Sequence, residues 1–367
     1  MVSNPHHRHQ RPRRLTVGLV APPWVSVPPA VYGGTEMVVD LLARGLQARG
    51  HEVVLFTTGD STCPVTRRWL HPHALGTASR LTEDAHVERA YQVLADVDIV
   101  HDHTVTGPSR PELHPPQAPV VATMHGTLSP PADRSYVRAA ASGVAVVAIS
   151  HDQRRSAPHL PVAAVIHHGI DVGSYPKGRG EGGYVLFLGR MSPDKGVHEA
   201  IEIARAAGRR IIVAAKMWEP DEHRYFTERV EPLLGSDAVY VGPVDHLRKV
   251  ELLGGAAALV NPIGWPEPFG LVMAEALACG TPVLAYPEGA APEIIDDGRT
   301  GFLCRSREEM VARLGEISTI DRDACRTAAT TRFSASRMVD QHLALYHDLL
   351  SDPAGIDLRR SGAALLT

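Results

Sequence analysis

The sequence predicts an α/β protein with two domains, each built on a parallel sheet covered by helices. The chain has 367 residues, too long for one ordinary core and about right for two domains. Short β-rich runs alternate with helical patterns through both halves, as is typical of parallel α/β layers. A glycine-rich stretch between the halves indicates a linker. The expected segments are a disordered basic tail (1–14), a first domain (15–172), the linker (173–183), a second domain (184–335), a final helix (336–350) and a weakly ordered tail (351–367).

The strands follow from runs rich in apolar and β-branched residues. In the first half these runs lie at residues 15–20, 53–58, 99–101, 120–124, 144–149 and 164–167. In the second half they lie at residues 185–188, 210–214, 238–241, 257–260 and 282–285. A helix is expected after Gly33 and Gly34, because apolar residues there recur three to five apart on one face. These residues are Met37, Val38, Leu41, Leu42 and Leu46.

The linker contains a pattern that is easily mistaken for a cofactor loop. Gly178, Gly180 and Gly183 match G-x-G-x-x-G, the pattern of dinucleotide-binding turns. That turn needs a strand before it and a helix after it, whereas here a strand follows. We therefore do not interpret this segment as a cofactor site.

The strongest functional pattern is a pair of carboxylates in the second half. Glu267 and Glu275 lie eight residues apart, the first in a proline-rich loop and the second inside a helix-forming run over 271–278. The start of that helix leaves backbone N–H groups free to hold an anion. One carboxylate can then contact a sugar and the other a ribose, with phosphate between them. The amides concerned belong to Phe269, Gly270, Leu271 and Val272.

Other candidate residues follow predicted strands, at the edge where α/β sheets bind ligands. Arg190 and Lys195 suit a diphosphate, Arg as a planar fork and Lys as a point charge. Gly33 and Gly34 precede a helix and allow a backbone to approach a ligand closely. His125 ends another run of the first domain.

The triplet His101-Asp102-His103 has two readings. Alternate residues of a strand share a face, so the two histidines can bind a metal ion. No third ligand is evident nearby, and we favour a polar rim of a substrate cleft. Asp102, His103 and Tyr32 are then the candidate contacts to a substrate held by the first domain, and no metal site is assigned.

These motifs resemble those of the retaining glycosyltransferases of family 4. Pro-Phe-Gly follows Glu267 and Ala-Cys-Gly-Thr-Pro-Val follows the second carboxylate, as in the E-x7-E signature of that family. The stretch from Gly189 to Gly196 is similar to its G-R-x4-K-G segment. Residues 287–303 resemble its P-E segment and its D-G-x-T-G-x-L turn. The resemblance extends over about residues 15–350 and is closest over 184–303.

The resemblance implies the GT-B fold, in which two Rossmann-like, doubly wound domains face each other across a cleft. It implies that the first domain binds the acceptor, that the second binds a nucleotide sugar, and that the final helix crosses back to the first domain. The implied reaction is retaining transfer of a hexose from a UDP- or GDP-sugar to a hydroxyl of a small molecule, natural-product scaffold or glycolipid. Neither a metal nor another cofactor is implied.

The resemblance also assigns roles to residues. Two cations neutralise the leaving diphosphate, one carboxylate holds sugar hydroxyls, and the other accepts hydrogen bonds from the ribose. The expected catalytic residues are His125, Glu267, Arg190 and Lys195. The expected donor-binding residues are Gly33, Gly34, Met217, Val244, Phe269, Gly270, Leu271, Val272 and Glu275.

Composition narrows the class of partner. A net charge of −4 and an aromatic content of 5% argue against nucleic-acid binding. No apolar run is long enough to span a membrane. The first 175 residues carry 15 Arg, no Lys and 14 acidic residues, so the first domain has no net basic excess that would attract an anionic membrane, and only a local contact is left open. The cysteines, at positions 63, 279, 304 and 325, form no C-x-x-C and read as free thiols, which favours a reducing compartment, the cytoplasm. The alanine- and arginine-rich composition suggests a bacterial gene.

Three other classes are weighed against this reading. A nucleotide-sugar epimerase or hydrolase of related fold would turn over the donor without an acceptor. A non-catalytic nucleotide-sugar-binding protein would not need the full set of carboxylates and cations. A phosphorylase would need pyridoxal phosphate on a lysine, for which no similar segment is present. Donor, acceptor and oligomeric state stay open.

Overall fold

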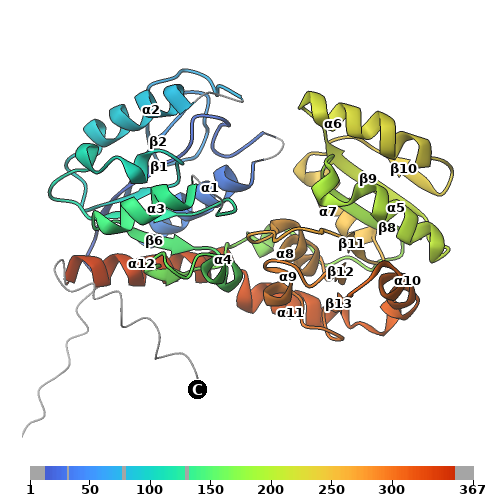
Figure 1. Cartoon of the computed structure of the whole chain (residues 1–367). Helices are drawn as coiled ribbons and strands as arrows, with labels where there is room; N and C mark the ends of the chain where they lie inside the picture. Colours follow the sequence, from blue (N-terminus) through green and yellow to red (C-terminus); the bar gives the residue numbers. More distant parts are fainter. Residues whose placement is uncertain (1–12, 31–32, 77–79, 129–131, 352–367) are drawn as a thin grey trace, which may run out of the picture.

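The computed structural model describes residues 13–30, 33–76, 80–128 and 132–351, which form two α/β domains side by side (Figure 1). Over these residues the first domain has a seven-stranded parallel sheet of order β3-β2-β1-β4-β5-β6-β7. The second has a six-stranded parallel sheet of order β10-β9-β8-β11-β12-β13. The predicted architecture of two doubly wound parallel sheets is confirmed.

The strands of the first sheet are β1 (Thr16–Val20), β2 (Glu52–Thr57), β3 (Thr66–Trp69), β4 (Ile99–Asp102), β5 (Val120–Thr123), β6 (Ala145–Ala148) and β7 (Ala164–Val165). Those of the second sheet are β8 (Val185–Arg190), β9 (Ile211–Lys216), β10 (Ala238–Tyr240), β11 (Leu259–Asn261), β12 (Val283–Ala285) and β13 (Gly301–Leu303). The helices before β8 are α1 (Gly34–Ala48), α2 (Arg80–Val93), α3 (Ala132–Ala141) and α4 (His151–Ser156). The later ones are α5 (Val197–Ala206), α6 (Pro220–Tyr225), α7 (His246–Gly255), α8 (Leu271–Ala278), α9 (Ala291–Ile294), α10 (Arg307–Glu316), α11 (Arg322–Arg332) and α12 (Ala335–Ser351).

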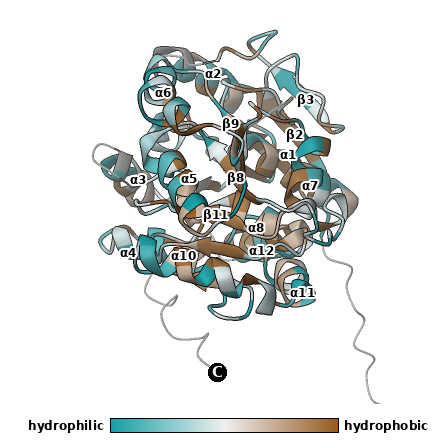
Figure 2. Cartoon of the chain, turned by 90° about the vertical axis from the view of Figure 1, so that its right-hand side faces the viewer, coloured by the Kyte–Doolittle hydropathy of each residue, from teal (hydrophilic) through white to brown (hydrophobic). Residues whose placement is uncertain are grey.

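Helices cover both faces of the first sheet, so its strands are apolar at successive positions. Ile99 packs toward α1 and α12, whereas its neighbour Val100 packs toward α2 and α3. Val121 and Val120 divide between the two faces in the same way. Hydrophilic residues cover the outside of α4, α6 and α10 (Figure 2). Because helices cover both faces of the sheet, a ligand can reach its residues only at the ends of the strands.

The last helix, α12, belongs in space to the first domain. It runs beneath that domain in Figure 1 and buries Met338, Val339 and Tyr346 in its core. The crossing with α1 is close, because a Cβ on Gly45 would lie 2.4 Å from Val339 Cγ2. A glycine is therefore needed at that position.

The glycine-rich linker lies against the second domain. The amides of Gly178, Gly180 and Gly182 donate hydrogen bonds to the carbonyls of Cys279, Gly254 and Gly255. A Cβ on Gly178 would lie 2.2 Å from Gly254 Cα, so the glycines permit close backbone packing. This packing accounts for Gly178 and Gly180, and Gly183 has a φ of 72°, in the left-handed region that favours glycine, so the pattern is explained without a cofactor.

Two strands were not predicted from the sequence. β3 is an edge strand with the polar sequence Thr-Arg-Arg-Trp, and β13 is a three-residue strand directly after a turn. β8 extends to Arg190, two residues beyond the predicted run. The expected terminal tails fall almost wholly outside the described residues. Within the described part of the chain no helix is long and apolar enough to cross a membrane.

Candidate active site

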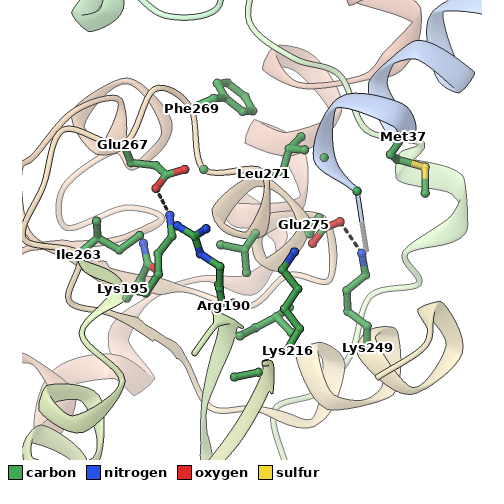
Figure 3. Close-up of a pocket in the computed structure, with 18 of the residues that line it drawn as sticks. Met37, Arg190, Lys195, Lys216, Lys249, Ile263, Glu267, Phe269, Leu271 and Glu275 are labelled. Carbon is green, nitrogen blue, oxygen red and sulfur yellow. Dashed lines mark hydrogen bonds and ion pairs between the residues drawn. The ribbon is translucent and has the colours of Figure 1, made fainter. Parts of the chain in front are cut away.

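A cavity of about 290 Å³ lies between the two domains, at the carboxyl ends of their strands. The first domain contributes residues that include Gly33, Gly34, His125 and His168. The charged residues of the second domain that line it are Arg190, Lys195, Lys216, Lys249, Glu267 and Glu275 (Figure 3). Of the described lining residues, four are thus cations and two are carboxylates, a net charge that favours an anionic ligand.

Helix α8 presents both its N-terminus and Glu275 to this cavity. Its N-cap is Gly270, at φ 85°, in the left-handed region that favours glycine, and it offers no side chain to cap the helix. Phe269, Gly270, Leu271 and Val272 all line the cavity. The helix begins at Leu271, and the predicted bounds are confirmed. Its N-terminus is therefore available to an anion.

Glu275 is held by two donors. Its Oε1 accepts hydrogen bonds from Tyr175 Oη at 2.7 Å and from Lys249 Nζ at 2.5 Å. Burial, followed by the neighbouring carboxylate, raises the pKa of Tyr175 well above its ordinary value, so Tyr175 stays a donor. The orientation of Glu275 is thus set before any ligand binds.

Glu267 forms an ion pair with Lys195, and both side chains are mostly buried. Lys195 also lies over the ring of Trp265, 4.8 Å from its centroid. The backbone of Glu267 is fixed from behind, because its carbonyl accepts a hydrogen bond from Ala290 and a Cβ on Gly289 would lie 2.4 Å from it. The side chains of Glu267 and Lys195 are therefore held together at the cavity wall by their ion pair and by the fixed backbone of Glu267.

Arg190 and Lys216 end neighbouring parallel strands. They are direct partners in the register of β8 and β9, so their side chains leave the same face of the sheet. Arg190 lies 3.6 Å from Asp194 and 3.5 Å from Glu222. Lys216 Nζ lies 4.0 Å from the ring centroid of Trp218.

The first domain forms the opposite wall. Gly34 lies so near α8 that a Cβ on it would be 3.4 Å from Leu271 Cδ1. His125 stacks on His168 with a centroid distance of 5.1 Å, and its loop is held by Gln153, whose amide donates to the carbonyls of Met124 and Gly126. Burial lowers the pKa of His125 to about 3, so its ring is neutral at pH 7.

The predicted acceptor rim is wrong for the His101-Asp102-His103 triplet. Asp102 is fully buried and accepts hydrogen bonds from Tyr91 Oη at 2.6 Å and from the amide of Thr104 at 2.7 Å. His103 is also buried, behind His125, with Nδ1 of the former 2.9 Å from Nε2 of the latter. Strand β4 ends at Asp102, but the residues packed around this strand end enclose both side chains, so neither can reach an acceptor.

His101 is buried too, and its two nitrogens face Tyr346 Oη and Thr123 Oγ1, each at 2.7 Å. These partners satisfy the ring without a metal ion. Tyr32, the third candidate acceptor contact, lies outside the described residues. Of the expected donor-binding residues, Val244 lines the cavity, whereas Met217 packs against the second-domain core and is not among the lining residues.

Across the described residues, one group of three side chains could hold a metal ion: His151, His167 and Glu293. Glu293 belongs to α9 of the second domain and accepts hydrogen bonds from the amides of His151 and Asp152 at 2.8 and 2.7 Å. His167 Nε2 lies 2.8 Å from the same carboxylate. None of the three residues lines the cavity, and their contacts already join the two domains.

Sequence reasoning missed Lys216, Lys249 and His168 as lining residues. One signal was available for the two lysines. The chain has only four lysines among 37 basic residues, and three of the four line this cavity. No local motif surrounds any of the three missed residues.

Two family descriptions match consecutive parts of the chain, which together extend from residue 32 to residue 331. Residues 177–331 match "Glycosyl transferases group 1" and residues 32–174 match "Glycosyltransferase Family 4". A glycogen synthase of Mycobacterium tuberculosis is 27% identical, over 84% of this chain and 87% of that protein. A phosphatidyl-myo-inositol mannosyltransferase of Mycolicibacterium smegmatis is 27% identical, over 95% of this chain and 97% of that protein.

Solved structures agree with the fold. AviGT4, a glycosyltransferase involved in avilamycin A biosynthesis, is 29% identical with a TM-score of 0.73, over 92% of this chain and 98% of that one. HepE of Anabaena, solved with UDP and glucose, has a TM-score of 0.74 at 19% identity, over 92% of this chain and 100% of that one.

Proposed function

The chain belongs to the group 1 and family 4 glycosyltransferases of GT-B fold, and on this premise we propose that it is a retaining hexosyltransferase using a nucleoside diphosphate sugar. The observation that carries the proposal is the interdomain cavity, where four cations and a free helix N-terminus surround two fixed carboxylates. The binding of UDP and glucose by HepE supports a donor of the UDP-sugar type.

In the proposed mechanism the diphosphate leaves toward positive charge. Arg190, Lys195 and the amides at the start of α8 stabilise the negative charge that grows on the leaving oxygen. Glu275, already oriented by its two donors, accepts hydrogen bonds from the ribose hydroxyls. Glu267 holds hydroxyls of the hexose, and its charge favours an oxocarbenium-like transition state.

Retention is proposed to follow a front-face course. The acceptor oxygen bonds to the anomeric carbon on the side from which the phosphate oxygen departs. The acceptor proton passes to that phosphate oxygen, so no enzyme carboxylate becomes glycosylated. Neutral His125, at the first-domain wall, faces the hexose. No metal or other cofactor is required, because the cations already compensate the diphosphate.

The acceptor is proposed to be a hydroxyl compound that binds against the first domain. The names of AviGT4 and of the phosphatidyl-myo-inositol mannosyltransferase support a natural-product scaffold and a glycolipid respectively, and a small molecule is the third class of acceptor proposed. A cytoplasmic location is proposed because the described structure has four free, buried cysteines, at positions 63, 279, 304 and 325.

A thermal-shift panel tests the donor class. One of UDP, GDP, ADP and dTDP is expected to raise the melting temperature, because a ligand that binds only the native state stabilises it. The corresponding nucleotide sugar is then incubated with and without candidate hydroxyl acceptors. Product that forms only with an acceptor supports a transferase, whereas donor turnover alone favours an epimerase or hydrolase. Binding without any turnover favours a nucleotide-sugar-binding protein.

A further inference from the structure

A line of histidine rings extends from the cavity wall into the core of the first domain. His125 and His168 stack on each other at the cavity, and both line it. His103, directly after β4, lies behind His125 with 5.1 Å between the ring centroids. His101 follows, with its ring centroid 4.1 Å from that of His103. Of these four rings, only His125 has a role in the proposed mechanism.

The inner rings are fixed in place. The two nitrogens of His101 face Tyr346 Oη of α12 and Thr123 Oγ1 of β5, each at 2.7 Å. His103 is 3% exposed, and its Nδ1 lies 2.9 Å from Nε2 of His125. The other ring nitrogen of His103 is enclosed and has no partner among the described residues. Within that part of the chain, the contact with His125 is therefore the one hydrogen bond of the His103 ring.

This hydrogen bond decides how the ring of His125 is turned. A histidine ring fits its surroundings in two orientations of similar shape, which differ by a half turn. Stacking on His168 fixes the plane of the His125 ring but allows either orientation. The hydrogen bond to His103 requires Nε2 to face the interior, so it selects one of the two. Without it the ring is free to turn, and a different edge then faces the cavity.

Both rings are neutral at pH 7, so they attract instead of repelling each other. Burial lowers the pKa of His125 to about 3. Burial, and then the neighbouring histidines, hold the pKa of His103 well below its ordinary value. A neutral imidazole has one N–H donor and one acceptor nitrogen, so one ring donates to the other.

We propose that His103 is a positioning residue for the donor hexose, and that its hydrogen bond to Nε2 of His125 holds the His125 ring in the orientation that fits the sugar. This inference rests on the proposed function, in which His125 faces the hexose. His103 itself is enclosed behind His125 and does not touch the ligand. Its loss should therefore weaken binding of the sugar and spare binding of the nucleotide.

The test measures binding of UDP and of UDP-glucose by calorimetry, or of the GDP or ADP counterparts if the wild type prefers that base. His103→Leu removes the hydrogen bond to His125. It is expected to weaken UDP-glucose binding about fivefold and to change UDP binding by less than about twofold, as the loss of one hydrogen bond between neutral groups at the sugar predicts.

The matched control is His86→Leu. His86 of α2 is also fully buried, with one ring nitrogen 3.0 Å from the carbonyl of Ala21 and the other without a partner among the described residues. It does not line the cavity. His86→Leu therefore removes an equivalent hydrogen bond elsewhere in the first domain, and it is expected to bind both ligands as the wild type does.

Two amide variants separate the position of the polar group from its polarity. The amide atoms of asparagine are as many bonds from the backbone as Nδ1 of histidine, whereas those of glutamine are one bond further. His103→Asn is expected to bind UDP-glucose within about twofold of wild type, and His103→Gln to bind it as weakly as His103→Leu. This pair gives an answer even if His103→Leu does not fold.

A double-mutant cycle shows whether His103 acts through His125. His125→Leu is expected to weaken UDP-glucose binding at least as much as His103→Leu does. Once the ring of His125 is absent, its orientation no longer matters. The double variant is therefore expected to match His125→Leu within about twofold.

Four results would overturn the inference. Equal losses of UDP and UDP-glucose binding in His103→Leu would show a purely structural role. Equal UDP-glucose affinity in His103→Asn and His103→Gln would show that this hydrogen bond does not set the orientation. Additive losses in the double variant, or wild-type binding in His125→Leu, would show that His103 does not act through His125. Failure of the wild type to bind any nucleoside diphosphate would instead contradict the proposed function itself.

Discussion

Replacement of Glu293 by glutamine is expected to loosen the junction between the two domains. The carboxylate is 13% exposed and accepts hydrogen bonds from the amides of His151 and Asp152, at the start of α4 in the first domain. His167 Nε2 also lies 2.8 Å from it. A glutamine offers one oxygen, and its NH2 group must then face one of these donors.

The magnitude follows from those contacts. A hydrogen bond to a charged group contributes about 1.5–3 kcal/mol, and a buried donor left without an acceptor costs about 1–3 kcal/mol. We therefore expect Glu293→Gln to destabilise the protein by about 2–3 kcal/mol and to lower the melting temperature by about 5 °C. The control is Glu316→Gln, because Glu316 is 52% exposed and forms a surface ion pair with nearby Arg313. That change is expected to alter stability by less than about 1 kcal/mol.

The same contacts set the pH dependence. Burial by itself raises the pKa of Glu293, but the hydrogen bonds from His167 and from the amides of His151 and Asp152 outweigh it and hold the pKa below 4.5. A carboxyl with a depressed pKa stabilises the fold above its unfolded-state pKa, and the contribution is lost as pH falls through the folded-state value.

Thermal unfolding of wild type and Glu293→Gln is therefore compared at about pH 7 and at several values below about pH 4.5. The difference in melting temperature is expected at pH 7 and should shrink as the wild-type carboxyl is protonated. Equal melting temperatures at pH 7 would refute the reasoning, and so would a difference that stays constant down to about pH 3.

Three further predictions concern the proposed reaction. Lys195→Ala and Arg190→Ala are each expected to weaken nucleoside diphosphate binding by about 1.5–3 kcal/mol. The control, Lys177→Ala, is expected to bind with wild-type affinity. Calorimetry that finds wild-type affinity in both Lys195→Ala and Arg190→Ala would contradict the diphosphate site. Glu275→Gln is expected to weaken binding of a nucleoside diphosphate without sugar, whereas Glu267→Gln mainly lowers kcat, and equal loss of nucleotide binding in both would remove this division of roles. Activity is expected to persist in excess EDTA, and the product is expected to keep the anomeric configuration of the donor, which NMR of the product checks. An inverted linkage would contradict the retaining mechanism. Activity that is lost in EDTA and restored only by added metal would contradict the metal-free mechanism.

Local sequence determined the parts of the site that lie close together along the chain. Glu267 and Glu275 flank the start of one helix, and Arg190 and Lys195 lie around one strand end, so their spacing follows from helix and strand geometry alone. The parallel sheets were predictable for a similar reason, since strands covered on both faces are nearly continuous apolar runs. A polar edge strand such as β3 lacks that pattern and was missed.

Tertiary structure alone decided which distant residues share the cavity and which are enclosed. Lys216 reaches the site because β9 lies beside β8, and Lys249 because α7 brings it to Glu275. Asp102 ends a strand as the cavity residues do, yet it is buried because Tyr91 from α2 covers it. Burial and charge pairing depend on contacts between residues far apart in sequence, and these same contacts set the pKa of Lys216.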